Sequence, residues 1–495
     1  MKIKFKLYLL AFIAGIFVAG CVEDTGNYIY QDPDELVPII NSTLEEHYDA
    51  ILQEQLEIEI DVDGDESNYN FAWYAYPPST TRILEDTLSH EMNLDYRVDL
   101  NPGLYTLVLK VTDKVNKTST YQETSLSVSS IYGVGYYVSK TEEGNTDLDF
   151  IDRFGVVNPN ILSYVNGESL SGEAINSAFF SSGYSYQEEL PDGAIIQHRN
   201  EPAFLVCSDN DFRIYQGETL QELADFETAF METPAVRAPG GVVATSTGFA
   251  LINNNHVHLL PSASRMGKLG YPFPNRNYDY SKYFISGTQS FIAYDDNLGQ
   301  FLGYTPSRNE AIMDPDETYR DYDLLFFAAQ PYYLFVSYYS YALLKHRTED
   351  KAYVVKLFSV GLGNSGVYQY TEYPVPMEMG VLDANIFAIS GANPVMYYSK
   401  GDNHIRYYNH SNQTEQDVLT LPEDEKVVYI KNVYDLAYGP NIFLVLTEKA
   451  GNWVLRVYNF EGSTPDLSLP AIETYSGTGK PSTVVHRNAN TYVTY

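Results

Sequence analysis

Residues 441–459 read NIFLVLTEKAGNWVLRVYN, and this stretch decides the fold. Its two apolar runs flank a polar turn around Gly451, which predicts two antiparallel strands joined by a tight hairpin. Related segments begin at residues 133, 203, 248, 290, 351 and 394. A strand pair that recurs every ~40 to 60 residues is typical of propeller blades. We therefore predict a β-propeller-like domain over residues 131–495, with roughly six to eight blades and about seven as the best value.

The repeats are degenerate, which leaves a second and a third β-sandwich as the alternative to a propeller. Helices are expected to be a minor component of the chain. The nearest match to an amphipathic helix is QELADFETAF at residues 221–230. The predicted fold class is therefore all-β.

Shorter alternating strands occupy residues 37–130, ahead of the propeller. QLEIEIDV at residues 55–62 alternates apolar and acidic side chains, and an acidic turn leads to YNFAWYAY at residues 69–76, so we expect these runs to form a hairpin. Residues 100–113 and 120–128 predict a second pair of strands around a polar turn. Roughly 95 residues of such strands indicate an immunoglobulin-like (Ig-like) sandwich.

The chain opens with a cationic segment followed by an apolar one. Three lysines precede residues 7–19, an uncharged run of about 13 residues, which suits the core of a signal peptide and is too short to span a bilayer comfortably. We predict a signal peptide over residues 1–20. The acidic residues 21–36, which include Pro33, predict a tether between the membrane and the folded body.

Small residues precede Cys21 in the order Val18, Ala19 and Gly20, and this order resembles the bacterial lipobox. The resemblance implies that Cys21 begins the mature chain and carries several acyl chains, which give stable membrane anchoring. An ordinary secretory signal that ends near a cysteine is the alternative. No second apolar segment is long enough to span a membrane, so we expect this lipid to be the sole anchor.

A second resemblance concerns the predicted sandwich. PGLYTLVLKVTD at residues 102–113, with the polar turn and final strand that follow, is similar to the closing half of a PKD domain. FAWY at residues 71–74 occupies the place of the central tryptophan strand of that family, although the usual WDFGDG run is missing. Together with the lipobox, these features resemble the PKD-like lipoproteins of Bacteroidota, which occur beside Sus-like nutrient uptake systems.

This resemblance implies a location and a set of partners. Glu23 and Asp24 are similar to the acidic signal that directs such lipoproteins to the cell surface. We therefore expect a lipid-anchored protein of the outer membrane that faces the cell exterior, with the periplasmic leaflet as the alternative. The implied protein partners are a TonB-dependent transporter and a lid lipoprotein.

Composition excludes some partners. The formal net charge is −34, from 65 acidic and 31 basic residues, and such a surface repels nucleic acid and anionic lipid. Only two cysteines occur, and lipid attachment at Cys21 would leave Cys207 alone. Cys207 lies in the apolar run AFLVCSDN, which predicts a buried, inert thiol and no disulfide.

Motifs for metal or cofactor chemistry are weak. His256 and His258 lie two apart on a predicted strand and could share a metal, but no third ligand is visible, so a hydrogen-bonded strand face is the better interpretation. The acidic run at residues 61–66 lacks the spacing of a calcium loop. The glycine motif at residues 361–366 precedes a strand pattern, whereas a dinucleotide site requires a helix there. We expect no metal, no cofactor and no catalytic set.

Two irregular aromatic segments, residues 268–284 and 317–323, remain as the predicted ligand surface. Tyrosine and phenylalanine rings stack on sugars or pack against partner proteins, and Pro272 and Pro274 interrupt regular strand pairing. The residues chosen are Tyr271, Phe273, Arg276, Tyr278, Tyr280, Tyr319 and Tyr322. The alternative is that these loops only close one blade against the next.

The predicted function is therefore binding of a glycan, peptide or partner protein by an accessory of a Sus-like uptake system. The protein is not expected to be an enzyme, because no catalytic motif is recognisable. The alternative is a propeller-based glycan-active hydrolase or lyase, whose acidic residues would be hidden among the 65 carboxylates.

Overall fold

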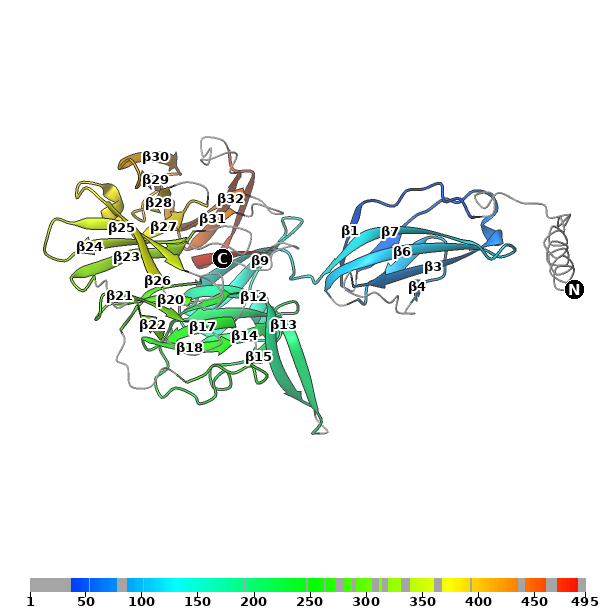
Figure 1. The fold of residues 1–495 in the computed structure, drawn as a ribbon, viewed down its shortest axis with the longest axis horizontal. Helices are drawn as coiled ribbons and strands as arrows, with labels where there is room; N and C mark the ends of the chain where they lie inside the picture. The colour runs from blue at the N-terminus through cyan, green and yellow to red at the C-terminus, as the bar shows by residue number, and fades with distance from the viewer. Residues whose placement is uncertain are drawn as a thin grey trace, which may run out of the picture. The chain divides into compact units, whose positions relative to one another are not determined.

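The chain forms two compact units, and each is described here by itself (Figure 1). All structural statements below concern the residues that the computed structural model describes. These are residues 37–52, 54–77, 87–100, 102–190, 193–245, 248–261, 264–271, 279–286, 291–304, 311–313, 319–330, 339–359, 367–391, 394–434, 441–459 and 470–487. The signal peptide, the tether and Cys21 lie outside them.

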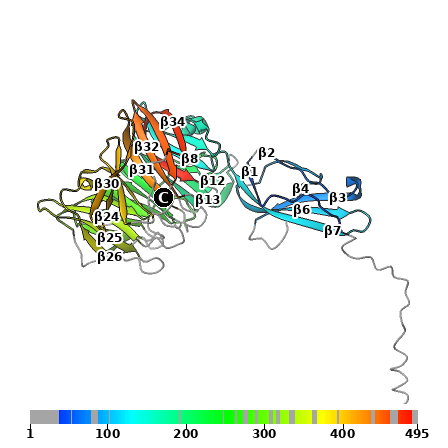
Figure 2. The same cartoon turned by 90° about the horizontal axis from the view of Figure 1, so that it is seen from above.

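The N-terminal unit is a sandwich of two antiparallel sheets (Figure 2). The larger sheet has the order β1 (His47–Ile51), β7 (Ser119–Ser129), β6 (Gly103–Asp113), β3 (Tyr69–Tyr76) and β4 (Thr87–Ser89), and the smaller sheet pairs β2 (Gln55–Ile58) with β5 (Leu94–Arg97). Trp73 of β3 and Leu94 of β5 are both buried. The indole Nε1 of Trp73 donates a hydrogen bond to Met92 O at 3.2 Å, which links β3 to the segment leading into β5. The predicted Ig-like sandwich is confirmed.

The predicted hairpin between residues 55–62 and 69–76 is wrong. β2 pairs with β5, whereas β3 pairs with β6 and β4, so the two runs belong to different sheets. The acidic segment between them contains a short 3-10 helix, Glu66–Asn68, which Asp65 caps by accepting from Ser67 N. Alternation of apolar and polar residues identifies a strand but does not specify its partner. The second predicted pair, β6 and β7, is confirmed by adjacency in the sheet.

The C-terminal unit contains seven antiparallel sheets in the described residues, which we number as blades in chain order. Blade 1 contains β8 (Gly135–Glu142), β9 (Asn145–Asp152), β10 (Val157–Asn158), β11 (Leu170–Ser171) and β35 (Lys480–Arg487). Blade 2 contains β12 (Ala174–Glu189), β13 (Ile195–Ser208), β14 (Phe212–Gln216) and β15 (Glu222–Ala224). Blade 3 contains β16 (Pro239–Thr245), β17 (Gly248–Asn253) and β18 (His256–Pro261). Blade 4 contains β19 (Tyr280–Ser286), β20 (Phe291–Asp295), β21 (Gln300–Tyr304) and β22 (Ala311–Met313).

The remaining three blades have four strands each. Blade 5 contains β23 (Tyr322–Ala329), β24 (Tyr339–His346), β25 (Ala352–Ser359) and β26 (Val367–Pro374). Blade 6 contains β27 (Ile386–Ile389), β28 (Val395–Ser399), β29 (His404–Asn409) and β30 (Thr414–Thr420). Blade 7 contains β31 (Lys426–Tyr434), β32 (Asn441–Lys449), β33 (Asn452–Asn459) and β34 (Glu473–Thr478). Helical structure among the described residues is limited to α2 (Ile161–Asn166) and short 3-10 turns such as Gly380–Asp383.

The blades close into a ring through one edge strand each, which is the first strand of blades 2 to 7 and the C-terminal strand β35 of blade 1. β12 contacts β16, and contacts continue in order through β19, β23, β27 and β31 to β35, which contacts β12 again. The C-terminal strand β35 pairs with β8, so blade 1 combines residues from both ends of the unit. The propeller prediction and its best value of seven blades are confirmed.

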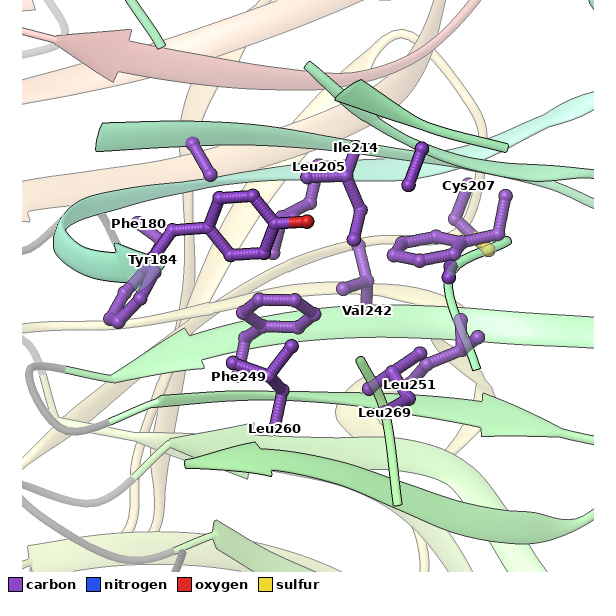
Figure 3. Close-up of a cluster of buried hydrophobic side chains, with 14 of the residues drawn as sticks. Phe180, Tyr184, Leu205, Cys207, Ile214, Val242, Phe249, Leu251, Leu260 and Leu269 are labelled. Carbon is purple, nitrogen blue, oxygen red and sulfur yellow. The ribbon is translucent and has the colours of Figure 1, made fainter. Parts of the chain in front are cut away.

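Apolar side chains fill the spaces between neighbouring blades, because each blade is covered on both faces. Figure 3 shows one such space, where Phe180 and Leu205 of blade 2 face Val242, Phe249 and Leu251 of blade 3. Residues 221–230, the nearest candidate for a helix, form β15 and a following turn. None of the described helices is long and apolar enough to cross a membrane.

Candidate functional site

The structure separates the seven residues that the sequence places in a ligand surface. Phe273, Arg276 and Tyr278 lie outside the described residues. Tyr271 is 62 % exposed, whereas Tyr280 is 6 % and Tyr319 is 7 % exposed.

Tyr280 and Tyr319 pack between blades. Tyr280 lies in the cluster that joins blades 3 and 4, and its hydroxyl hydrogen-bonds with that of Tyr304. Tyr319 lies in the cluster that joins blades 4 and 5, and its hydroxyl donates to Glu372 Oε1 at 2.8 Å. Tyr322 is half-buried, and its ring meets that of Tyr319 edge-on at 5.6 Å. For Tyr280 and Tyr319 the geometry therefore agrees with loops that close blade against blade, and a role for any of the seven in binding stays a prediction.

The two histidines of β18 have separate local partners. His258 is buried, its Nδ1 lies 3.1 Å from Gly270 O, and burial lowers its pKa to about 4. His256 Nδ1 lies 2.6 Å from Asn254 O. In the described part of the chain, no three His, Cys, Asp or Glu side chains gather in a way that could hold a metal ion. The residues of the glycine motif at 361–366 lie outside that part.

Cys207 is fully buried, and burial raises the pKa of its thiol far above the usual range. A thiol in this environment stays protonated, so it is a poor nucleophile. The prediction of a buried cysteine is confirmed, and its low reactivity stays a prediction.

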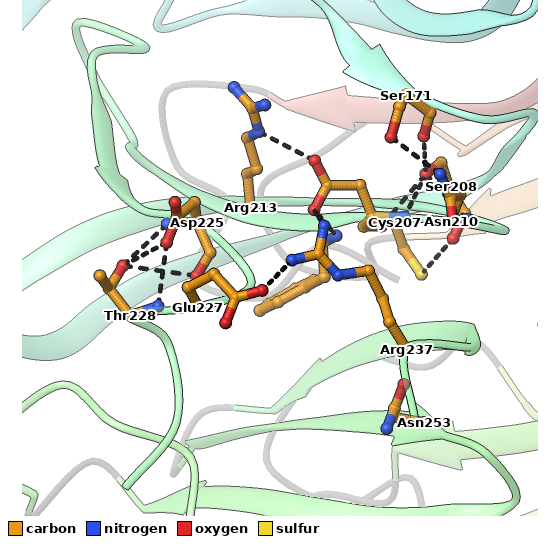
Figure 4. A network of polar contacts seen from close by, with 12 residues as sticks. Ser171, Cys207, Ser208, Asn210, Arg213, Asp225, Glu227, Thr228, Arg237 and Asn253 are labelled. Atoms are coloured by element: carbon orange, nitrogen blue, oxygen red, sulfur yellow. Dashed lines mark hydrogen bonds and ion pairs between the residues drawn. The ribbon is translucent and has the colours of Figure 1, made fainter. Parts of the chain in front are cut away.

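Charged groups at the outer part of blade 2 are paired with one another (Figure 4). Asp211 accepts from Arg213 Nε at 3.2 Å and lies 3.8 Å from Arg237 Nη1. Arg237 also pairs with Glu227 and stacks over the ring of Phe226 at 4.5 Å. Each guanidinium thus has carboxylate partners, and the network ties blade 2 to the chain entering blade 3. Such mutual compensation indicates a structural role.

The sandwich has an open hollow with a volume of about 810 Å³. Its lining includes the rings of Tyr69 and Tyr74 of β3, His90 after β4 and the basic Lys110 of β6. At its edge, Lys114 Nζ donates to Ser67 O at 2.7 Å. Rings beside hydrogen-bonding groups suit a polar ligand with flat faces, such as a sugar. The sequence placed FAWY on a sandwich strand but did not indicate that its neighbours line a hollow.

A pair of basic side chains lies at the inner strands of blades 7 and 1. Lys431 of β31 and His486 of β35 are both half-buried. Burial lowers the pKa of His486 to about 4, and the charge of Lys431 is a smaller cause of the same shift. The ring of His486 lies 4.8 Å from that of Tyr136. Sequence reasoning missed this pair, because its members are far apart in the chain. The available signal was a lysine within the otherwise apolar alternation of KVVYIKNVY.

A concentration of carboxylates lies where blade 4 meets blade 5. Burial and the neighbouring charge of Asp279 raise the pKa of Asp296 to about 6. Asp295 is buried and accepts hydrogen bonds from Asn297 N and Leu298 N through Oδ1. These local bonds indicate a turn held by an aspartate at the end of β20.

Comparisons with known proteins match a family model to the N-terminal part of the chain and find distant similarities among solved structures. The model of the PKD-like family matches residues 21–174, which include the sandwich and the strands β8 to β11 of blade 1. No curated protein sequence matches the chain. A quinonprotein alcohol dehydrogenase-like protein from Bacteroides thetaiotaomicron is 13% identical, with 91% of this chain and 99% of that chain covered and a TM-score of 0.39. The WD40 domain of Toxoplasma gondii coronin is 11% identical, with 68% and 83% covered and a TM-score of 0.39.

Proposed function

We propose that the protein is an outer-membrane surface lipoprotein that binds a glycan, peptide or partner protein as an accessory of a Sus-like uptake system. The observation that carries the proposal is the start of the PKD-like match at Cys21, the residue that the lipobox resemblance makes the first of the mature chain. The sandwich then stands between the lipid and the propeller in sequence. A lipid on Cys21 would anchor the chain ahead of both folded units, so that the sandwich and the propeller would both be available for binding.

The structure supports a binding role through the hollow of the sandwich and the closed ring of blades. Propellers present many loops on a rigid scaffold, although a fold does not assign a function. The specific partners, a TonB-dependent transporter and a lid lipoprotein, rest on the family resemblance.

Lipid attachment is tested by expressing the full chain with radiolabelled palmitate, beside Cys21→Ala and the matched control Cys207→Ala. The wild type and the control should carry label, whereas Cys21→Ala should carry none. Antibody against the propeller should also reach the wild type on intact cells. Label on Cys21→Ala would contradict the anchor, and a signal only after outer-membrane disruption would contradict the surface location.

Binding is tested with a chain that begins after Cys21, on a broad glycan and peptide array, together with co-purification of the lipidated protein from membranes. Tyr74→Ala should weaken binding if the sandwich surface is used, with the exposed Tyr164→Ala in blade 1 as control. Absence of both array binding and a co-purifying transporter would contradict the proposal. Turnover of an array polymer would instead favour the glycan-active hydrolase or lyase.

A further inference from the structure

The hollow of the sandwich lies over the outer face of β3 and β6. Trp73 of β3 is fully buried in the core, so its neighbours Ala72 and Tyr74 point to the opposite, outer face of the sheet. Lys110 of β6 pairs with Ala72, and directly opposed residues in a sheet share a face. All three outer residues line the hollow, which is therefore built on the side of the sheet that faces away from the core.

Ala72 has the smallest side chain of the residues that line the hollow. Its neighbours on the same face of β3 are Asn70 and Tyr74, and Lys110 stands opposite it on β6. A methyl group among three longer side chains leaves space above the sheet. The resulting volume of about 810 Å³ lies within the ~300 to 1,000 Å³ of small-molecule sites, so the hollow is large enough for a ligand.

Hydrogen bonds fix two segments of the lining. In the first segment, Ser67 N donates to Asp65 Oδ1 at 2.9 Å, and Lys114 Nζ donates to Ser67 O at 2.7 Å. In the second, Met92 O accepts from Trp73 Nε1 at 3.2 Å. The hollow is therefore formed before a ligand arrives, which lowers the entropy cost of binding.

The charges of the lining nearly cancel, in contrast to the net charge of −34 for the whole chain. Three carboxylates and two ammonium groups give the lining a formal charge of −1 when His90 is neutral; these groups belong to Asp65, Glu66, Glu91, Lys110 and Lys114. A ligand with a strong charge of either sign would meet like charges as well as opposite ones. Donors and acceptors in one lining instead suit hydroxyl groups, which both donate and accept hydrogen bonds.

We propose that this hollow binds a neutral glycan, with a sugar ring over Ala72 and against Tyr74 and with the hydroxyl groups bonded to the polar lining. Tyr74 is half-buried, so part of its ring stays open to a sugar face. An apolar peptide fits less well, because most side chains of the lining end in polar groups. The inference rests on the proposed binding function and names the ligand class and its site.

The experiment is isothermal titration of the chain that begins after Cys21 with neutral tetrasaccharides and with three contrasting ligands. The neutral glycans are cellotetraose, maltotetraose, laminaritetraose and mannotetraose. The contrasts are tetragalacturonate, which is acidic, tetralysine, which is basic, and tetra-alanine, which is a peptide without charged side chains. At least one neutral tetrasaccharide should bind ~10-fold or more tightly than all three contrasts.

The outcomes separate this inference from the proposed function. Equal or tighter binding of tetragalacturonate or tetralysine would overturn the neutral class. Tighter binding of tetra-alanine, or no binding of any tetrasaccharide, would overturn the glycan assignment. In that case, binding of a peptide on the array or co-purification of a transporter would still support the proposed function.

Variants locate the site. Ala72→Met should fill the hollow and lower the affinity for the tightest neutral tetrasaccharide by ~10-fold or more. Thr106→Met is the control, because Thr106 pairs with Tyr76 further along the same face of the sheet and lies outside the lining. Unchanged binding by Ala72→Met, or an equal loss in Thr106→Met, would contradict the site.

A second pair of variants does not depend on the folding of Ala72→Met. Tyr74→Ala should lower the same affinity by roughly 3- to 10-fold, because it removes the ring. Tyr74→Phe keeps the ring and should keep most of the affinity. Unchanged binding by Tyr74→Ala, or an equal loss in Tyr74→Phe, would contradict the predicted contact between the sugar and the ring.

Discussion

Trp453 Nε1 donates a hydrogen bond to Asp149 Oδ2 at 2.8 Å and so joins blade 7 to blade 1. Both side chains are fully buried. Asp149 also receives Lys140 Nζ at 2.9 Å and Asn160 N at 2.9 Å. The indole N–H of blade 7 is thus one of three donors to the Asp149 carboxylate of blade 1. This carboxylate lies beside the strand pair that closes the ring.

Trp453→Phe should lower the free energy of unfolding of the propeller by about 1 to 3 kcal/mol, because it leaves Asp149 Oδ2 buried without this donor. Urea unfolding followed by fluorescence and circular dichroism measures the change. The control is Trp73→Phe, which removes a comparable indole hydrogen bond in the sandwich. If Trp73→Phe destabilised the propeller and Trp453→Phe did not, the predicted role of the hydrogen bond between Trp453 and Asp149 would be contradicted.

Arg487 and Glu218 form an enclosed ion pair next to the ring closure, and Arg487 Nη1 also donates to Gly217 O at 2.6 Å. Glu218→Gln should destabilise the propeller by roughly 3 kcal/mol, since it leaves the guanidinium without its counter-charge. Glu218→Gln combined with Arg487→Met should recover part of the loss. Chemical denaturation of Glu218→Gln, Arg487→Met and the double variant measures the coupling.

The exposed pair Lys351 and Glu349 serves as the control for this series. Glu349→Gln should leave stability almost unchanged, because water screens exposed ion pairs. A Glu218→Gln variant as stable as Glu349→Gln would show that the enclosed pair contributes little to the closed ring.

Asp296→Asn should stabilise the protein at neutral pH. Burial and the charge of Asp279 raise the pKa of Asp296 from 3.8 to about 6 in the folded state, so the fold favours the protonated form. Stability from this group is complete below pH ~4, falls as pH rises towards 6 and stays lower above it. We expect a gain of about 1 kcal/mol at pH 7.5, after discounting for partial exposure, and no gain at pH 4.

Thermal unfolding of wild type and Asp296→Asn across this pH range measures the effect of Asp296. Asp99→Asn, in the N-terminal half of the chain, controls for the general reduction of negative charge. A gain that is equal at pH 4 and pH 7.5 would show that the pKa shift is not its cause.

Lys431→Met should stabilise the protein at pH 7. Burial lowers the pKa of Lys431 from 10.5 to about 8, so the folded state disfavours the charged form. The penalty is absent above pH ~10.5, grows as pH falls towards 8 and is complete below it. Because the side chain is half-buried, we expect a gain of about 1 to 2 kcal/mol, measured by denaturation at pH 7 and 9. A destabilised Lys431→Met would indicate that the ammonium has a partner in the folded protein.

Much of the fold follows from local sequence. Residues 441–459 form β32 and β33, and the turn between them places Ala450 and Gly451 at φ values of 50° and 78°. Two consecutive positive φ angles are the geometry of a type I′ hairpin, which the short polar turn favours. Recurrence of such pairs then predicts blades, because a single strand pair cannot bury its own apolar faces.

The aromatic surface shows where local reasoning fails. Tyr280 and Tyr319 stand in irregular segments, yet both are buried between blades, whereas Tyr271 is exposed. The composition of a segment does not predict which neighbouring blade will cover it. Burial of these rings depends on strands that are adjacent in space only after the ring has formed.

The sequence by itself determined most of the strands, hairpins such as that of residues 441–459, the all-β fold class and the burial of Cys207, since these depend on side-chain alternation, turn residues and apolar content. The tertiary structure alone decided that β2 pairs with β5, that β35 closes the ring beside β8, and that the strands of Lys431 and His486, β31 and β35, contact each other. Each of these relationships joins positions that no local hydrogen bond or periodicity connects. Their physical cause is the burial of the apolar faces of the sheets, which depends on residues that are far apart in the chain.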